Sequence, residues 1–261
     1  MLTAITRAVS PAIVHCELTF LDRHPIDLET ARRQHRAYER ALEKLGARVI
    51  TLPEEPALPD SMFVEDPAIV LDELAVIMPL GTPSRQPEAV SLAQALAPFR
   101  SLQFITAPGR MEGGDILRIG RKLYAGLSTR TNARGLEQLA KILQPHNYQV
   151  IGVPVAGCLH LKSAVTCVGR NTLLANRGWF DSGPLTGYDW IDVDPSEPGA
   201  ANALALGDTV LFPASFPKTS ARLAAAGFAL APVDIAELQK AESGLTCSSL
   251  LFDDFRETGT P

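Results

Sequence analysis

Three residues far apart in the chain carry side chains that could act together in catalysis. Cys247 follows a turn of small residues and precedes an apolar, strand-like run. His160 stands between two leucines, and Glu112 is followed by two glycines before another apolar run. A thiol, an imidazole and a carboxylate in strand-like surroundings are the components of an enzyme with a cysteine nucleophile. The sequence therefore favours covalent catalysis through Cys247.

A cluster of acids adds information about the substrate. Asp60, Glu65 and Asp66 fall within seven positions. Acidic groups that accompany a cysteine nucleophile indicate a substrate that carries positive charge. The formal net charge of −5 is compatible with a cationic small molecule and argues against nucleic acid as a partner.

Each catalytic candidate also has an ordinary structural interpretation. Taken alone, Glu112 fits a solvated turn, His160 a hydrogen-bonded core histidine and Cys247 a small buried hydrophobic residue. Because all three stand at strand edges next to turn residues, their combination favours a catalytic site. A metal site is the competing chemistry, but the five histidines and four cysteines show no metal-ligand spacing. Since a glycine-rich nucleotide loop is also missing, we expect no metal and no organic cofactor.

The composition is that of a globular chain. Hydrophobic residues make up 46% of the 261 positions and charged residues 20%, which excludes a disordered or fibrous protein. The length suits one large domain or two small ones. The first residues lack the apolar core of a signal peptide, and no apolar stretch reaches membrane-spanning length, so we expect no membrane partner. The four cysteines form no CxxC pair, which predicts free thiols in a reducing cytoplasm.

Hairpins alternate with helices along the chain, and these elements must position the candidate residues. Helical spacing of apolar residues and capping signals predict helices at 27–45, 87–99, 132–143 and 218–226. Paired apolar runs around short turns predict hairpins at 68–78, 116–125, 164–175 and 203–212. Single strands are expected at 48–52 and 150–153, and an irregular, glycine-rich stretch at 178–187. A unit of hairpin, helix and strand recurs about every 40 to 50 residues, which is the range of cyclic arrays.

Several short motifs occur in an order that is itself informative. They are Arg33-Gln34-His35, Phe63-Val64-Glu65-Asp66, Pro83-Ser84-Arg85, Glu112-Gly113-Gly114-Asp115, Ser128-Thr129-Arg130-Thr131-Asn132, Leu159-His160-Leu161-Lys162 and Gly244-Leu245-Thr246-Cys247. Their order and spacing, over nearly the full length, resemble the dimethylarginine dimethylaminohydrolase family. That family belongs to a guanidine-modifying superfamily with the arginine deiminases.

The resemblance implies a fold and a set of site residues. The fold would be a five-bladed α/β propeller of ββαβ pseudo-repeats around a central active-site channel, formed by residues 1–261 as one domain. Cys247, His160 and Glu112 would be catalytic. The substrate-binding residues would be Leu18 on a mobile lid, Asp60 at the substrate amino group, Glu65 and Asp66 at the guanidinium, Arg85 and Arg130 at the carboxylate, and Ala241.

The implied reaction converts N-omega-methylated arginine to citrulline and a methylamine through a covalent thiouronium on Cys247. The expected partner is a small-molecule guanidine, and a homodimer is compatible with the sequence. Two alternatives stay open. One is a deiminase or amidinotransferase that acts on another guanidine, and the other is a non-catalytic guanidine-binding protein on the same scaffold. Arg85 and Arg130 favour a substrate with a free carboxylate over agmatine.

Overall fold

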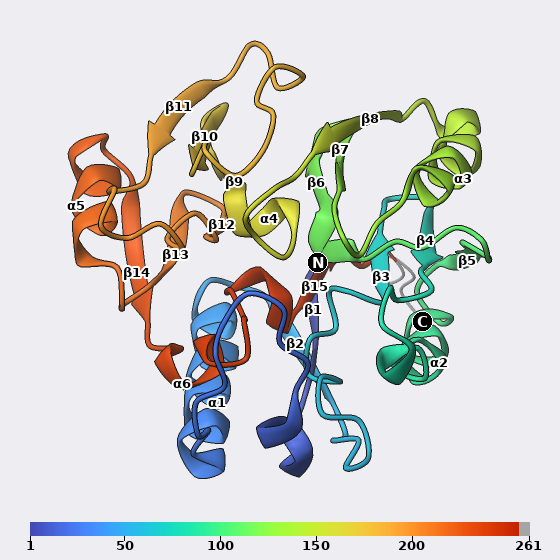
Figure 1. Cartoon of the computed structure of the whole chain (residues 1–261), viewed down its shortest axis with the longest axis horizontal. Coiled ribbons are helices and arrows are strands. Elements are labelled where there is room, and N and C mark those ends of the chain that lie inside the picture. The colour runs from blue at the N-terminus through green and yellow to red at the C-terminus, as the bar shows by residue number, and fades with distance from the viewer. Residues whose placement is uncertain (256–261) are drawn as a thin grey trace, which may run out of the picture.

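The computed structural model describes residues 1–255 and contains five three-stranded sheets. The sheets lie around a common centre, and the longer helices lie on the outside (Figure 1). In each sheet the middle strand pairs antiparallel with one neighbour and parallel with the other. The expected five-bladed α/β propeller is confirmed.

The blades follow one another along the chain. The first contains β15 (Leu250–Asp253), β1 (Leu2–Arg7), α1 (Leu28–Lys44) and β2 (Arg48–Leu52); the second contains β3 (Ala68–Val70), β4 (Leu74–Ile77), α2 (Glu88–Leu96) and β5 (Ser101–Phe104). The third contains β6 (Ile116–Ile119), β7 (Lys122–Leu127), α3 (Ala133–Leu143) and β8 (Gln149–Pro154). The fourth contains β9 (Val165–Gly169), β10 (Thr172–Ala175) and β11 (Asp189–Asp192), and the fifth β12 (Leu204–Leu206), β13 (Thr209–Pro213), α5 (Pro217–Ala225) and β14 (Ala229–Val233).

Local sequence accounts for the elements that were predicted. Helix α1 begins where the Asp27 side chain accepts a hydrogen bond from the Thr30 N–H at 2.6 Å, and Gly46 leaves it at a φ of +90°. Its apolar stripe is buried. The hairpin turns at Gly120 and Gly207 have φ values of +59° and +55°, which glycine adopts without strain.

Two features depart from the predicted pattern. The fourth blade has no helix between β10 and β11, so the ββαβ unit is not kept there. The connection runs through the irregular stretch expected at 178–187, and it is visible as the ochre loop beside β11 (Figure 1). The strands β1, β5, β11 and β14 were not predicted; the side chains of β5 and β11 are half-buried or exposed and give little apolar signal.

The two ends of the chain close the ring. Strand β1 pairs antiparallel with β15, so that Ile5 lies opposite Leu250. The apolar clusters also lie between blades: Ile5 and Phe252 of the first blade pack with Val70 and Ile77 of the second. Each blade therefore buries its faces against its neighbours rather than within itself.

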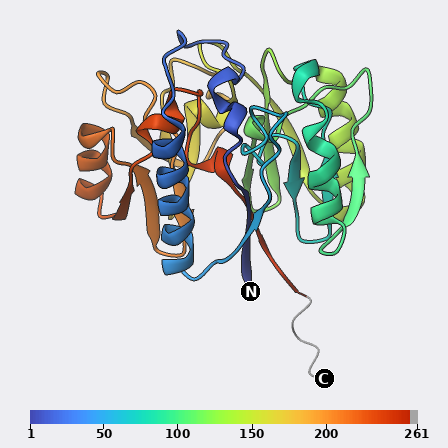
Figure 2. The ribbon, with the colours of Figure 1, turned by 90° about the horizontal axis from the view of Figure 1, so that it is seen from below.

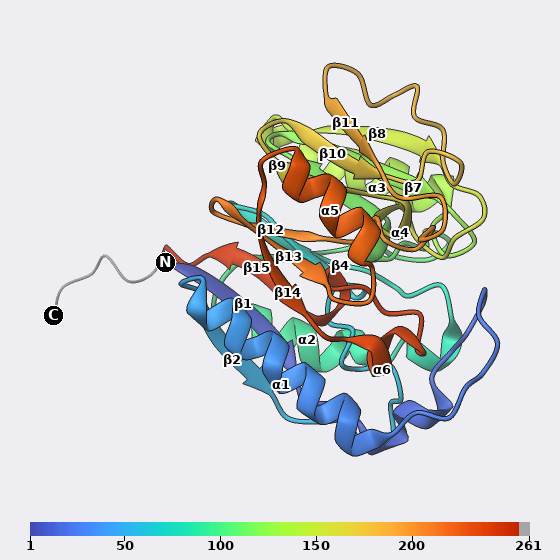
Figure 3. The same cartoon turned by 90° about the vertical axis from the view of Figure 1, so that its left-hand side faces the viewer.

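The two faces of the ring differ. Figures 2 and 3 show the N-terminus and the end of β15 on one side and the long blue segment between β1 and α1 on the other. That segment contains the short 3-10 helix η1 (Pro11–His15) and the residues expected to form a lid. Among residues 1–255, no helix combines the length and apolar character needed to cross a membrane.

Candidate active site

The three expected catalytic residues lie at or in short helical turns that connect the blades. Glu112 precedes the 3-10 turn η3 (Gly113–Asp115), His160 precedes α4 (Leu161–Ala164), and Cys247 lies in η5 (Thr246–Ser248). His160 and Cys247 line the same small cavity, which has a volume of about 20 Å³. Of the ten predicted site residues, seven line it: Asp60, Asp66, Arg85, Arg130, His160, Ala241 and Cys247.

Glu112 and His160 form a buried pair. The His160 Nε2 atom lies 2.7 Å from Glu112 Oε2, and both side chains are almost completely shielded from solvent. Glu112 Oε1 accepts hydrogen bonds from the Gly81 N–H at 2.9 Å and from Arg130 Nη1 at 3.3 Å. The carboxylate is therefore held from three directions and can orient the imidazole.

The two glycines after Glu112 are required by close packing. A Cβ atom at Gly113 would lie 2.0 Å from the carbonyl oxygen of Glu65, and one at Gly114 would lie 2.5 Å from His160 Nδ1. No side chain larger than hydrogen fits between the turn and His160. This close packing explains why two glycines follow Glu112 in the Glu-Gly-Gly-Asp motif.

The charges of the pair stabilise each other. Burial opposes ionisation of both groups, but the carboxylates of Asp66, Glu112 and Asp115 raise the pKa of His160 to about 9. The hydrogen bond and charge of His160, together with the two nearby arginines, lower the pKa of Glu112 to about 2. At neutral pH the pair is an imidazolium and a carboxylate.

The thiol of Cys247 is in a different electrostatic environment. Burial and the negative charges of Glu65 and Asp66 raise its pKa to about 12, although the Gly244 N–H donates a hydrogen bond to Sγ at 3.3 Å. Without a further cation, the residue is a neutral thiol at pH 7. A positively charged ligand in the cavity would favour the thiolate.

The expected carboxylate-binding arginines are buried, which excludes the solvated surface role they could have had. Arg85 and Arg130 are only 4% and 7% exposed. Arg85 donates to Asp66 Oδ2 at 2.9 Å and forms two parallel hydrogen bonds, of 3.1 and 3.0 Å, to Glu88. Arg130 donates to Thr19 in the segment before α1 at 3.0 Å. A guanidinium has five N–H groups, so each arginine keeps donors for a ligand carboxylate.

Two acids, Asp60 and Asp66, also line the cavity. Asp66 Oδ1 is buried and accepts no hydrogen bond from the described residues. Asp60 accepts a hydrogen bond from the Glu17 N–H at 3.1 Å, and burial raises the pKa of its carboxyl group. A buried acceptor without a donor is costly, and a cationic ligand would satisfy it.

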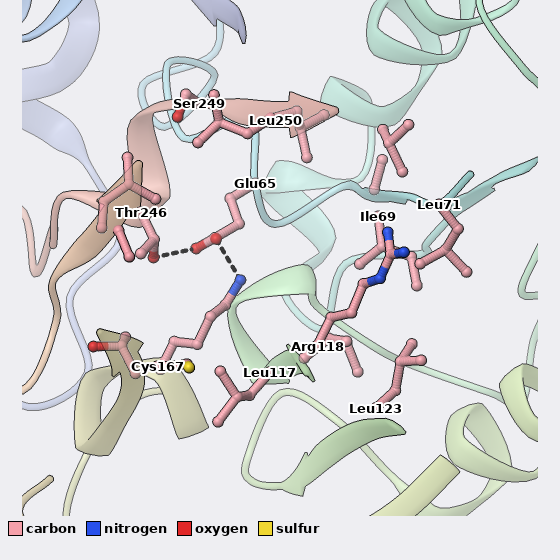
Figure 4. Close-up of a pocket in the computed structure, with 18 of the residues that line it drawn as sticks. Glu65, Ile69, Leu71, Leu117, Arg118, Leu123, Cys167, Thr246, Ser249 and Leu250 are labelled. Atoms are coloured by element: carbon pink, nitrogen blue, oxygen red, sulfur yellow. Dashed lines mark hydrogen bonds and ion pairs between the residues drawn. The ribbon is translucent and has the colours of Figure 1, made fainter. Parts of the chain in front are cut away.

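Three predicted residues do not line the cavity: Glu112, which lies behind His160, and Glu65 and Leu18. The Glu65 carboxylate pairs with Lys162 and accepts a hydrogen bond from Thr246 Oγ1 at 2.7 Å. It lines a second cavity of about 270 Å³ in the middle of the ring, where dashed lines mark both contacts (Figure 4). Leu18 packs against the apolar cluster near Cys16, while its neighbour Glu17 lines the small cavity beside Cys247.

Several residues of the site were not predicted. Glu88 holds Arg85, Asp115 accepts the Leu161 N–H at 2.9 Å and so fixes the start of α4, and Glu242 lines the cavity. Asp115 and Lys162 belong to the motifs at 112–115 and 159–162, so the sequence did contain a signal for a role of these two residues. No local sequence signal distinguished Glu88 from a surface acid, since only the packing of the folded chain buries it beside Arg85.

One group among residues 1–255 has the geometry to hold a metal ion. Ligand atoms of Asp66, Glu112 and His160 lie within 4.8 Å of one another. These residues are distant in the sequence, so their spacing could not reveal the group. Glu112 already bonds to His160 and Arg130, and Asp66 to Arg85, which fits a hydrogen-bonded network of charges better than a metal centre.

Comparisons with known proteins agree with this geometry. The family model described as arginine deiminase matches residues 54–199. The N(G),N(G)-dimethylarginine dimethylaminohydrolase of Streptomyces coelicolor is 36% identical and covers 95% of each chain. The enzyme of the same name from Pseudomonas aeruginosa is 34% identical over 87% of this chain and 90% of its own.

Solved structures give the same result. A cysteine-to-serine variant of the Pseudomonas aeruginosa enzyme, in complex with citrulline, superposes with a TM-score of 0.91 at 32% identity, and covers 96% of this chain and 98% of its own. A histidine-to-glycine variant of a dimethylarginine dimethylaminohydrolase, as an adduct with S-methyl-L-thiocitrulline, gives the same TM-score over 97% of this chain and 100% of its own. The chain therefore belongs to the dimethylarginine dimethylaminohydrolase family, within the group that the arginine deiminase model describes.

Proposed function

We propose that the protein hydrolyses N-omega-methylated arginine to citrulline and a methylamine, with Cys247 as nucleophile. The observation that carries the proposal is the cavity itself: the thiol of Cys247, the imidazole of His160 and a buried acceptor at Asp66 line one small space, and Glu112 bonds to the imidazole. The names of the relatives point to the same substrate class.

The charges around the cavity support the chemistry. A guanidinium is stabilised by resonance and reacts poorly with nucleophiles, so its plane must be fixed and its charge localised. Asp66 would accept guanidinium N–H groups, while the cation favours ionisation of the Cys247 thiol. The role of Glu65 in this step stays a prediction, because its carboxylate is engaged with Lys162 and Thr246.

The reaction then proceeds in two covalent steps. The Cys247 thiolate attacks the central guanidinium carbon, His160 protonates the leaving amine, and the carbon–nitrogen bond breaks. This leaves a thiouronium on sulfur. His160, now neutral, takes a proton from water as the water attacks the same carbon; the carbon–sulfur bond breaks, and citrulline is released. Glu112 stabilises the imidazolium before the first proton transfer and after the second.

The other end of the substrate is assigned by complementary charge. Arg85 and Arg130 would bind the carboxylate, and Asp60 the amino group. Ala241 would pack against the substrate, and Leu18 would act through the lid segment next to Glu17. We further propose that the enzyme is cytoplasmic, because all four cysteines are free thiols. Its partner would be a small guanidine, and the reaction as written uses no cofactor.

A substrate panel tests the proposal. Citrulline release is measured with asymmetric dimethylarginine, monomethylarginine, arginine and agmatine, with Cys247→Ser as the control for nucleophile-dependent turnover. We expect turnover of the methylated substrates and none by the serine variant, whose hydroxyl is not ionised near neutral pH. Faster release from unmethylated arginine would instead identify a deiminase. Absence of turnover on all four substrates would contradict the proposal.

A further inference from the structure

We propose that Asn202 is a positioning residue, which fixes the turn that carries Cys247 and ties this turn to the chain just after His160. The inference rests on the proposed function for its consequence in catalysis. Asn202 lies in the chain that enters β12, in none of the motifs recognised in the sequence, and it is 6% exposed. Its importance follows from its contacts.

The Asn202 amide bridges two segments that are remote in the sequence. Its oxygen accepts a hydrogen bond from the Thr246 N–H at 3.0 Å. Its nitrogen donates to Thr246 Oγ1 and to the Lys162 carbonyl oxygen, both at 3.0 Å. Both amide hydrogens of Asn202 are therefore used. The amide binds the backbone N–H and the hydroxyl of Thr246, the residue before Cys247, at the same time.

The Thr246 hydroxyl extends the contact into a closed circuit. Because Oγ1 accepts from Asn202, its single hydrogen is free to donate to Glu65 Oε2, at 2.7 Å. Glu65 in turn pairs with the Lys162 ammonium, and these last two contacts are seen from the central cavity (Figure 4). Glu65, Lys162 and Thr246 line the central cavity, while Cys247, the residue after Thr246, lines the catalytic one.

Packing makes the geometry specific. A Cβ atom at Gly244 would lie 2.3 Å from Cγ of Asn202, so the backbone of the nucleophile turn rests directly on the amide. The Gly244 N–H is the donor to Cys247 Sγ. Asn202 is itself fixed, because Thr166 Oγ1 donates to the Ala201 carbonyl oxygen at 2.6 Å and accepts from the Ala203 N–H at 3.1 Å.

The consequence is a defined place for the sulfur relative to the imidazole. Asn202 binds the residue before Cys247 and the carbonyl oxygen of Lys162, which lies two residues after His160. A displacement of about 1 Å between reacting groups can reduce a rate by about 100-fold. Replacement of Asn202 should therefore reduce the rate of the chemical steps more than substrate binding, since Arg85 and Arg130 lie on other elements.

The first experiment compares Asn202→Ala with a matched control. We expect kcat with dimethylarginine to fall by about 100-fold and KM to change by less than about threefold. Hydrogen exchange of the peptide that contains residues 243–249 should accelerate. Thr219→Val is the control, because Thr219 is fully buried, its hydroxyl accepts the Asp194 N–H at 3.0 Å, and it lies away from the site. Per folded molecule, the control should keep its kcat and its exchange at 243–249.

Variants at Thr246 provide a second test that does not depend on the folding of Asn202→Ala. Thr246→Ser keeps the hydroxyl, whereas Thr246→Val keeps the shape and loses it. We expect the serine variant to recover most of the kcat that the valine variant loses. Unchanged exchange at 243–249 in Asn202→Ala, or equal kcat for the two Thr246 variants, would overturn the proposal. If the wild type turns over no guanidine, the proposed function fails, while the exchange measurement still decides whether Asn202 holds the turn.

Discussion

Single residues of the site are linked by charge rather than by apolar contact. Asp66, Glu88 and Glu112 are each 3% exposed or less, and they surround two buried arginines and His160. Burial raises the pKa of Glu88 to about 7 even though Arg85 opposes the shift. Buried charges of this kind persist only when each has a partner, so removal of one partner affects its neighbours.

The first prediction concerns the proton carrier. His160→Ala should lower kcat by about 100- to 10,000-fold, because one imidazole serves as acid and then as base. Glu112→Gln should have a smaller effect, since the amide can still hydrogen-bond to the ring while it no longer stabilises the charge. Citrulline release measured at saturating dimethylarginine checks both variants. Near-normal turnover of His160→Ala would make the imidazole a structural residue.

The second prediction concerns pH. The productive free enzyme needs His160 protonated and Cys247 ionised, with pKa values of about 9 and about 12. Below pH 9 the histidine stays charged while the thiolate fraction grows about tenfold per pH unit, so kcat/KM should rise. Above pH 9 loss of the imidazolium cancels this gain, and the profile should level off. A profile for dimethylarginine that falls steadily from pH 7 to 9 would contradict this ionisation scheme.

The third prediction concerns Arg130. Loss of one charge-assisted contact is worth about 1.5–3 kcal/mol, so Arg130→Ala should lower kcat/KM for methylarginine by roughly 10- to 150-fold. Agmatine has no carboxylate and should lose much less. Arg134→Ala is the control, because its side chain is 68% exposed and forms its ion pair with Glu137, which is also exposed. Equal losses on both substrates would show that Arg130 supports the structure of the site instead.

Among the elements, the segment between η1 and α1 borders the cavity, which Glu17 lines. The cavity of about 20 Å³ has room for little more than one water molecule, so we expect this segment to move when a substrate binds. The segment is held by Glu242, whose carboxylate accepts hydrogen bonds from the N–H groups of Thr19 at 3.0 Å and Leu21 at 2.6 Å. Glu242 has a φ of +56°, an uncommon conformation for this residue type.

The fourth prediction follows from this contact. Glu242→Ala should release the segment, so that amide exchange over residues 17–23 accelerates while exchange within β13 stays unchanged. KM for dimethylarginine should rise, because binding must then order the segment as well. Glu237→Ala is a useful control, since Glu237 accepts the Asp27 N–H at the other end of the same segment. If the two variants behave alike, the contact at Glu242 has no special role in closure.

At the scale of the whole molecule, the ring is held by contacts between consecutive blades. Phe252 of β15 lies edge-to-face against Phe99 of the second blade, with ring centroids 5.2 Å apart, and Arg100 lies 5.4 Å from its ring. The first blade is completed only when both ends of the chain have met. That residues 1–261 form one domain stays a prediction, and a single unfolding transition would support it.

The fifth prediction tests this closure. Phe252→Ala should lower the free energy of unfolding by about 3–5 kcal/mol, the usual effect of removing a buried aromatic ring. Phe104→Ala should have little effect, because that side chain is 53% exposed. Denaturant unfolding followed by circular dichroism measures both. Equal effects for the two variants would show that the Phe99–Phe252 contact does not stabilise the ring.

The sequence by itself determined the hairpins, the main helices and the motifs of the site. These depend on the period of apolar residues and on turn and capping residues, which are local properties. It also led to the identification of the family, because the order of several short motifs is specific. The tertiary structure alone decided four contacts: Glu65 pairs with Lys162, Glu88 with Arg85, Asn202 bonds to Thr246, and Glu242 accepts the Thr19 N–H in the segment before α1. Such partners can be 181 residues apart, as for Thr246 and Glu65, and only the packing of blades decides which polar groups meet.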